Sequence, residues 1–147
     1  MITLRSIVKL TCKSLNQGLH FQKCHVGWIG LGFMGTPMAN HLINKGNSLV
    51  VYDINSAAVV ASSPAEVAEK CDRVFTMVPA DPYVIEKGTI LMDCSTVHPN
   101  TSKKLLQLSN DAGVDFLDTP VAGAVPAANA GMLAVHSVSY HEFCKQK

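Results

Sequence analysis

The sequence has little excess charge of either sign and no long hydrophobic run, and these two absences exclude two classes of partner. Its 12 Lys and Arg residues nearly balance 11 Asp and Glu residues, which leaves a formal net charge of +1. Because phosphate binding needs concentrated positive charge, we expect no nucleic-acid partner. No uninterrupted apolar stretch approaches the ~20 residues of a membrane-spanning helix, so we expect no membrane partner either.

Cysteine is also scarce and dispersed. The five cysteines form no C-x-x-C pair, and their odd number does not favour a disulfide framework; they are Cys12, Cys24, Cys71, Cys94 and Cys144. His136, His141 and Cys144 lie close together in the sequence, but their spacing does not match established zinc-ligand patterns. We therefore expect reduced thiols and no metal site.

The chain does contain enough apolar material for one folded domain. Hydrophobic residues make up 48% of the 147 residues and charged residues 16%, a balance typical of a globular chain rather than of a disordered one. A chain of this length accommodates a single domain with a buried core.

The N-terminal segment differs in charge from the rest of the chain. No acidic residue precedes Asp53, whereas Arg5, Lys9 and Lys13 recur every fourth residue and would share one face of a helix. A basic amphipathic segment with hydroxyl side chains and no acidic ones is typical of a mitochondrial transit peptide. We expect residues 1–24 to direct the protein to the mitochondrial matrix; a basic arm without a targeting role is the alternative.

One stretch combines the signals of a strand, a glycine-rich turn, a helix and a second strand. The apolar run 26–29 leads into Gly30-Leu31-Gly32-Phe33-Met34-Gly35. Thr36-Pro37 then supplies an N-cap and a first-turn proline for a helix. The β-rich run 48–52 follows and ends at Asp53. This order predicts a βαβ unit.

The glycine spacing suits a dinucleotide. The first two glycines of G-x-G-x-x-G permit a tight turn and close approach of a diphosphate, while the third lets helix and strand pack together. The helix that follows points unpaired N–H groups and its positive dipole end at the phosphates. Asp53 follows Gly35 by 18 positions, near the ~20 expected for a carboxylate that binds the adenosine ribose of NAD.

NAD is therefore the expected cofactor. Ile54 and Asn55 offer no arginine for the additional phosphate of NADP, which the carboxylate of Asp53 would repel. An ordinary turn aspartate is the alternative interpretation of Asp53.

The remaining residues predict further alternation of strands and helices. Ser63-Pro64-Ala65-Glu66 has the pattern of a capping box with proline in the first turn of a helix. Three more strands are expected at 73–78, 89–93 and 115–119, and a helix is expected at 100–112. Such alternation implies a Rossmann-like, doubly wound parallel α/β sheet, which we place in residues 25–135.

Two of the expected connections are short. Parallel neighbouring strands need a crossover of about a dozen residues, but only residues 53–58 separate the second strand from the apolar Val59-Val60-Ala61. The stretch 79–88 is similarly brief. We therefore expect an incomplete or frayed sheet in this region.

The run V-G-W-I-G-L-G-F-M-G-T-P-M-A at 26–39 resembles the N-terminal signature of the β-hydroxyacid dehydrogenase family, which is more specific than the glycine motif alone. Four further segments follow in the family's order: S-S-P-A-E at 62–66, M-V-P at 77–79, D-C-S-T at 93–96 and D-T-P-V at 118–121. The resemblance extends to about residue 135 and is strongest to mitochondrial members that oxidise a 3-hydroxy acid in valine breakdown. It implies an NAD-dependent oxidoreductase that acts on a small 3-hydroxy acid.

The resemblance also implies roles for individual residues. It assigns the diphosphate to the backbone from Gly30 to Gly35 and the adenosine ribose to Asp53. It assigns the remaining contacts to Val78 and Pro79 on the adenosine side, Thr96 at the nicotinamide ribose, and Ser95 and Gly123 at the substrate. Ser95 and Thr96 also follow the end of an expected strand, where open α/β sheets bind ligands; a helix cap is the alternative for both.

The chain departs from the family at several points. The family's catalytic lysine lies in a G-x-x-x-K-x-x-x-N helix beyond the nucleotide domain, whereas Lys145 and Lys147 lack that setting and residues 136–147 diverge. The family's helical C-terminal domain, through which its members assemble, has no counterpart in this sequence. In place of the family's V-S-G-G, the substrate loop reads Val121-Ala122-Gly123-Ala124, which removes a hydroxyl donor. We therefore assign no catalytic residue and expect a truncated, catalytically impaired member.

Two further interpretations stay open. The chain could be a non-catalytic dinucleotide-binding module that retains the Rossmann half. It could also descend from an NADPH-dependent reductase of glyoxylate or succinic semialdehyde, against which the carboxylate of Asp53 argues.

Overall fold

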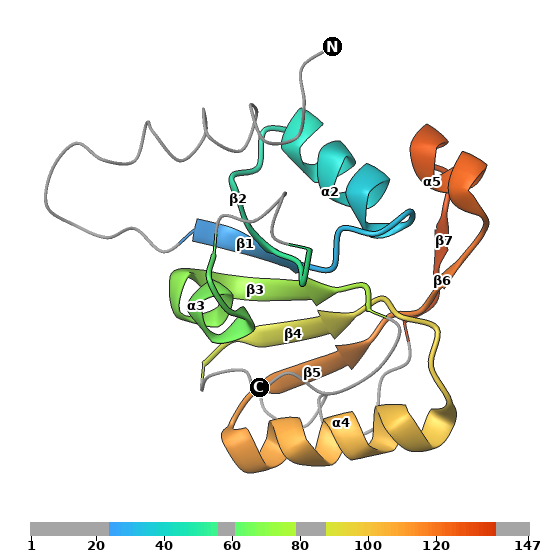
Figure 1. Ribbon diagram of the computed structural model, residues 1–147. Helices are drawn as coiled ribbons and strands as arrows, with labels where there is room; N and C mark the ends of the chain where they lie inside the picture. Colours follow the sequence, from blue (N-terminus) through green and yellow to red (C-terminus); the bar gives the residue numbers. More distant parts are fainter. Residues whose placement is uncertain (1–23, 56–60, 79–87, 138–147) are drawn as a thin grey trace, which may run out of the picture.

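The computed structural model describes residues 24–55, 61–78 and 88–137. At its centre is a parallel sheet of five strands in the order β2-β1-β3-β4-β5 (Figure 1). The strands are β1 (Cys24–Ile29), β2 (Leu49–Tyr52), β3 (Cys71–Thr76), β4 (Ile90–Asp93) and β5 (Asp115–Asp118). The chain runs from β1 outward to β2 and then returns to β3 on the other side of β1. The doubly wound parallel sheet expected from the sequence is confirmed.

Four helices and a two-stranded arm complete the described part of the fold. The helices are α2 (Gly35–Asn44), α3 (Pro64–Lys70), α4 (Pro99–Ala112) and α5 (Val125–Ala130). The arm pairs β6 (Val121–Ala122) with β7 (Ala134–Val135) in antiparallel orientation. In Figure 1 the arm and α5 lie on the side toward which the arrows of β3, β4 and β5 point.

Local capping explains where α3 and α4 begin and end. The Oγ of Ser63 accepts a hydrogen bond from the backbone N of Glu66 at 3.1 Å, and Pro64 occupies the first turn, as the sequence predicted. His98 caps α4 through its Nδ1, which accepts from the backbone N of Asn100 at 3.2 Å. Gly113 ends α4 in the left-handed conformation with φ 68°, where glycine carries no Cβ penalty.

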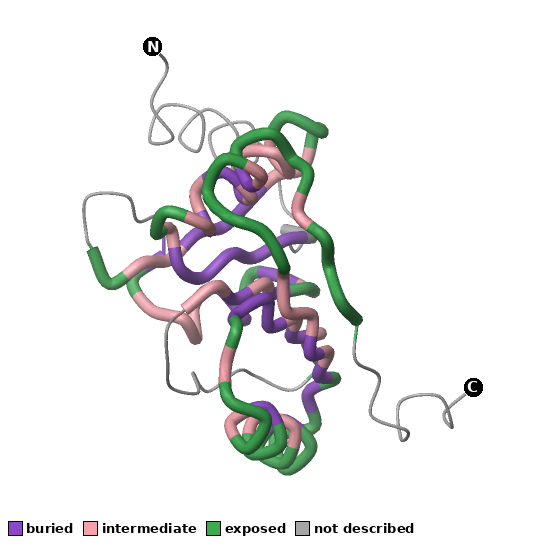
Figure 2. The backbone as a smooth tube through the Cα atoms, turned by 90° about the vertical axis from the view of Figure 1, so that its right-hand side faces the viewer, coloured by how far each residue is buried: buried purple, intermediate pink, exposed green. Residues whose placement is uncertain are grey.

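Each face of the sheet has its own apolar core. The face toward α3 and α4 buries Ile29, Val50, Ala61, Val67, Ala68, Cys71, Val74, Leu91, Val114 and Phe116. The face toward α2 buries Val26, Trp28, Ala39, Leu49 and Val51. Buried residues accordingly concentrate in the strands, while the segment from β6 to β7 is largely exposed (Figure 2). The coverage of both faces explains why β1 and β2 read as continuous apolar runs instead of alternating ones.

The sheet is continuous where fraying was expected. Gly27 of β1 pairs with Val50 of β2 on one side and with Val74 of β3 on the other. Val74 in turn pairs with Leu91 of β4. The expectation of a frayed sheet is therefore wrong for the described strands. Residues 56–60 and 79–87, within the two short connections, lie outside the described ranges.

Some sequence-based predictions fall on parts of the chain that the structure does not describe. They include residues 1–23 of the expected transit peptide. They also include Pro79 and, in the tail, His141 and Cys144. Among the helices of the described ranges, none combines the length and the apolar character needed to cross a membrane.

Candidate dinucleotide site

The glycine loop leaves the end of β1 and turns at Gly30, whose φ is +96°. A Cβ at Gly30 would lie 2.2 Å from the carbonyl oxygen of Met77, and a Cβ at Gly35 would lie 2.0 Å from the carbonyl oxygen of Gly30. Neither position leaves space for a side chain, because the obstructing atoms belong to the backbone. Because the first and third glycines have no Cβ, they allow loop, helix and strand to pack closely, as the motif predicted.

The middle glycine has the opposite environment. No atom lies within 4 Å of a Cβ built on Gly32, so a side chain there would project into open space. Among the described residues, the backbone N–H groups of positions 32–35 donate to no protein acceptor. These groups precede α2 or form its first turn, at the positive end of a helix of 10 residues. The loop thus presents several free donors beside an unobstructed surface, an arrangement suited to a diphosphate.

Asp53 lies beside this loop, although 22 residues separate it from Leu31. Its Oδ2 accepts a hydrogen bond from the backbone N of Leu31 at 2.5 Å, and its Oδ1 accepts from the backbone N of Asn55 at 2.8 Å. The neighbouring backbone N of Gly30 donates to the carbonyl oxygen of Tyr52 at 2.9 Å. The end of β2 and the glycine loop are therefore joined by two hydrogen bonds, which bring the predicted ribose carboxylate to the predicted phosphate loop.

The predicted N-cap role of Thr36 is wrong. α2 begins at Gly35, its N-cap is Met34, and no side chain caps it. Thr36 lies inside the first turn, and its hydroxyl donates to the carbonyl oxygen of Leu31 at 2.5 Å. The loop geometry, which local sequence patterns do not encode, decides where this helix starts.

Val78 and Ser95 are brought together at the ends of β3 and β4. The backbone N of Val78 donates to the Oγ of Ser95 at 3.0 Å. Ser95 is only 3% exposed, so in this conformation its hydroxyl faces Val78 and the interior. Thr96, the next residue, is exposed and available to a ligand at this edge of the sheet.

A buried polar network that the motifs did not reveal supports this edge. The Oδ1 of Asp93 accepts from the hydroxyl of Thr76 at 2.8 Å and from the backbone N of Ser95 at 3.0 Å. The carbonyl oxygen of Asp93 accepts from the backbone N of Thr119 at 2.8 Å. These contacts join the C-terminal ends of β3, β4 and β5. Asp93 and Ser95 belong to the D-C-S-T segment noted in the sequence, but that segment did not predict these hydrogen bonds.

Gly123 lies in the connection from β6 to α5 and has a φ of +137°. A Cβ there would lie 2.6 Å from a side-chain carbon of Leu133 and 3.3 Å from the Cβ of Ala127. The nearest atoms thus come from the segment between β6 and β7. α5 is joined to α2 by the Nε2 of His41, which lies 3.0 Å from the carbonyl oxygen of Ala128.

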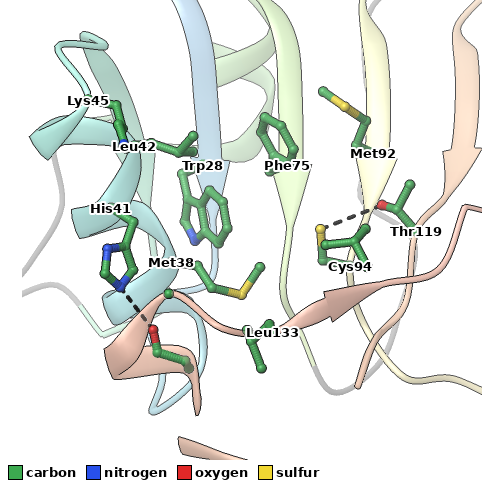
Figure 3. A pocket seen from close by; sticks show the side chains of 13 residues that line it. Trp28, Met38, His41, Leu42, Lys45, Phe75, Met92, Cys94, Thr119 and Leu133 are labelled. Carbon is green, nitrogen blue, oxygen red and sulfur yellow. Dashed lines mark hydrogen bonds between the residues drawn. The ribbon is translucent and has the colours of Figure 1, made fainter. Parts of the chain in front are cut away.

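A separate apolar pocket of about 390 Å³ lies on the α2 face of the sheet (Figure 3). Trp28 and Phe75 line it with their rings stacked at a centroid distance of 5.5 Å. Its polar members include Cys94 and Thr119, whose Sγ and Oγ1 lie 3.6 Å apart. Burial raises the pKa of the Cys94 thiol, which keeps it protonated at neutral pH. None of the predicted cofactor or substrate residues lines this pocket.

The metal-ligand candidates considered from the sequence lie mostly outside the described residues. Within the part of the chain that is described, no group of three or more His, Cys, Asp or Glu side chains could hold an ion. His136, one of the three residues considered from the sequence, uses its backbone N to donate to the carbonyl oxygen of Pro120 at 2.9 Å.

Comparison with known proteins agrees with this geometry. A protein-family model described as the NAD binding domain of 6-phosphogluconate dehydrogenase matches residues 25–142. The mitochondrial 3-hydroxyisobutyrate dehydrogenase of Mus musculus is 41% identical over a matched region that covers 76% of this chain. The chain spans about 40% of the length of that relative.

Two solved structures share the fold. The 3-hydroxyisobutyrate dehydrogenase of Mycobacterium tuberculosis, solved with L-serine, superposes with a TM-score of 0.69 at 26% identity, over 79% of this chain and 46% of the other. Psf3, solved in complex with NADP+ and 2-OPP, gives a TM-score of 0.67 at 26% identity, over 75% of this chain and 47% of the other.

Proposed function

The chain belongs to the family of the NAD binding domain of 6-phosphogluconate dehydrogenase, and from this membership we propose that it binds NAD as the nucleotide-binding part of a 3-hydroxyisobutyrate dehydrogenase. The proposed reaction converts 3-hydroxyisobutyrate to methylmalonate semialdehyde, a step of valine breakdown. The name of the Mus musculus relative supports this substrate, as does the family resemblance of the segments at 62–66, 77–79, 93–96 and 118–121.

The observation that carries the proposal is the open loop beside Asp53. Free N–H groups at 32–35 face a surface that no side chain of Gly32 obstructs, and a carboxylate lies at the adjoining strand end. These residues fit a dinucleotide, because the donors match a diphosphate and the carboxylate matches ribose hydroxyls. When bound, NAD would supply the hydride acceptor, while this chain's residues bind and orient it.

Asp53 favours NAD over NADP. Its carboxylate would repel the 2′-phosphate of NADP, and the exposed Ile54 and Asn55 that follow bring no positive charge. The bound NADP+ of Psf3 belongs to a fold relative, so a direct comparison of the two cofactors is the decisive test. Preference for NADPH would favour the alternative of a glyoxylate or succinic semialdehyde reductase.

The remaining contacts follow the order of the sheet. Val78 and Pro79 would lie along the adenosine side, and Thr96, exposed after β4, would reach the nicotinamide ribose. Gly123 would approach the substrate, together with Ser95 if its hydroxyl turns away from Val78. We place the nucleotide-binding domain at 25–135, a transit peptide at 1–24, and a divergent tail at 136–147; the mitochondrial relative supports a mitochondrial location, which we extend to the matrix.

A second candidate is dinucleotide binding without turnover. In the loop 121–124, Ala122 and Ala124 are exposed and bring no side-chain donor to a substrate carboxylate. Calorimetric titration with NAD, followed by an absorbance assay with NAD and 3-hydroxyisobutyrate, separates the candidates. Binding with turnover supports the dehydrogenase, binding without turnover supports the second candidate, and absence of NAD binding contradicts both.

A further inference from the structure

The peptide group of Leu31 is held from both sides by residues outside the G-x-G turn. Its N–H donates to the Oδ2 of Asp53 at 2.5 Å. Its carbonyl oxygen accepts from the hydroxyl of Thr36, also at 2.5 Å. One partner lies directly after β2 and the other lies in the first turn of α2, so this single residue connects the strand end to the helix start.

The backbone N–H groups of the loop fall into two groups, and Leu31 lies at the boundary between them. The N–H groups of Gly30 and Leu31 are taken by Tyr52 and Asp53. The N–H groups of positions 32–35 have no acceptor among the described residues. The position of Leu31 therefore sets the boundary between the backbone N–H groups that bind the protein and those that are open to a ligand.

Asp53 can take part in this arrangement and still bind a ribose. A carboxylate offers about four acceptor positions on its two oxygens, and the backbone N–H groups of Leu31 and Asn55 use one on each oxygen. The remaining positions are open to hydroxyl donors. Thr36 has no such second role, because its hydroxyl is turned toward the carbonyl oxygen of Leu31.

We propose that Thr36 is a positioning residue that, with Asp53, sets the glycine loop in its phosphate-binding shape before the cofactor arrives. The proposal rests on the proposed NAD site and adds a residue whose effect passes through Leu31. A loop that is ordered in advance loses less conformational freedom when its ligand binds, and this strengthens binding. The gain in affinity should apply to ligands with a diphosphate and not to the nucleoside alone, because Thr36 acts on the loop whereas only Asp53 would bind the ribose.

Thr36→Val is the appropriate test because it keeps the shape of the side chain and removes its hydroxyl. Thr101→Val, in the first turn of α4, is the matched control. Titrations of the full chain with ADP and with adenosine compare ligands with and without a diphosphate. We expect Thr36→Val to weaken the affinity for ADP about five- to tenfold, as loss of one hydrogen bond allows, and to leave the affinity for adenosine unchanged. Thr36→Ser, which retains the hydroxyl, restores ADP affinity.

Amide exchange of the ligand-free protein provides a second readout that does not depend on NAD. The N–H of Leu31 should exchange several-fold faster in Thr36→Val than in the wild type or in Thr101→Val. Unchanged exchange together with unchanged ADP affinity would overturn the proposal, and so would equal weakening of ADP and adenosine. If the wild type binds neither NAD nor ADP, the proposed function fails, while the exchange rate at Leu31 still decides whether Thr36 orders the loop.

Discussion

The α-carbon of Gly35 lies so close to the carbonyl oxygen of Gly30 that a Cβ on Gly35 would stand 2.0 Å from it. This contact brings the first turn of α2 against the end of β1 and leaves no space for any other residue. Gly32, three positions earlier, has no atom within 4 Å of a Cβ position. The two glycines of this motif therefore have different roles: Gly35 allows close packing in the fold, and Gly32 leaves the surface of the loop open.

The stability of alanine variants should separate these roles. Gly35→Ala forces the backbone of loop and helix apart, and we expect its free energy of unfolding to fall by about 2–4 kcal/mol. Gly32→Ala meets no atom and should change it by less than about 0.5 kcal/mol. Urea denaturation of both variants measures the difference, and equal stability of the two would contradict the packing described for Gly35.

Trp28 should stabilise the glycine loop through its side chain. Its indole N donates to the carbonyl oxygen of Gly30 at 2.8 Å, and the side chain is 1% exposed. Trp28→Phe leaves that oxygen without this donor and removes part of a buried ring, so we expect a loss of about 2–4 kcal/mol. Thermal and urea unfolding measure it. A loss below about 0.5 kcal/mol would show that the bond and the packing matter little.

Replacing Asp53 should change cofactor choice. Asp53→Asn removes the charge that, in the proposed site, would bind ribose hydroxyls and repel a 2′-phosphate. NAD affinity should therefore fall about tenfold, in line with the loss of a charge-assisted hydrogen bond, and NADP affinity should rise relative to it. Parallel titrations with both cofactors give the ratio, and Asp72→Asn, on β3, is a control that should leave it unchanged. An unaltered ratio in Asp53→Asn would contradict the ribose assignment.

Acid should weaken the start of α3. Hydrogen bonds from Lys70 and from the hydroxyl and backbone N of Ser62 lower the pKa of Glu66 from 4.5 to about 2. Because the folded-state pKa is depressed, the stabilisation is present above about pH 4.5 and is lost as pH falls toward 2. The pair with Lys70 is partly exposed, so solvent screening limits its contribution to below about 1 kcal/mol.

Urea denaturation between pH 6 and pH 2 tests this dependence. Glu66→Gln should be less stable than the wild type near neutral pH, and the difference should shrink as the pH falls. A difference that stays constant over this range would show that the charge of Glu66 does not contribute.

The sequence predicted those features that depend on neighbouring residues. The capping of α3 by Ser63 follows from side chain and backbone three positions apart, and the βαβ unit follows from the periodicity and glycine spacing of a single stretch. Even the pairing of the loop with Asp53 was anticipated, because the motif specifies where the second strand ends. The first two features have local causes, and the pairing with Asp53 was anticipated from the spacing of the motif.

Other features depend on strand register and could not be read from the sequence. The hydrogen bond that the hydroxyl of Thr76 donates to Asp93 forms only because β3 and β4 pair these two residues. The burial of Ser95 follows from the same pairing, and no local signal distinguished it from the exposed Thr96. The start of α2 was misplaced for a different reason: the hydroxyl of Thr36 binds the carbonyl oxygen of Leu31 in the loop instead of capping the helix. Continuity of the sheet likewise depends on pairing between distant segments.

Isothermal titration of NAD into the wild type and into Gly32→Ala tests the central claim most directly. We predict binding to the wild type and at least a tenfold loss in Gly32→Ala without any change in melting temperature, because the added methyl group enters the space reserved for the diphosphate. Absence of NAD binding to the folded wild type, or equal binding by the two proteins, would contradict a dinucleotide site at this loop.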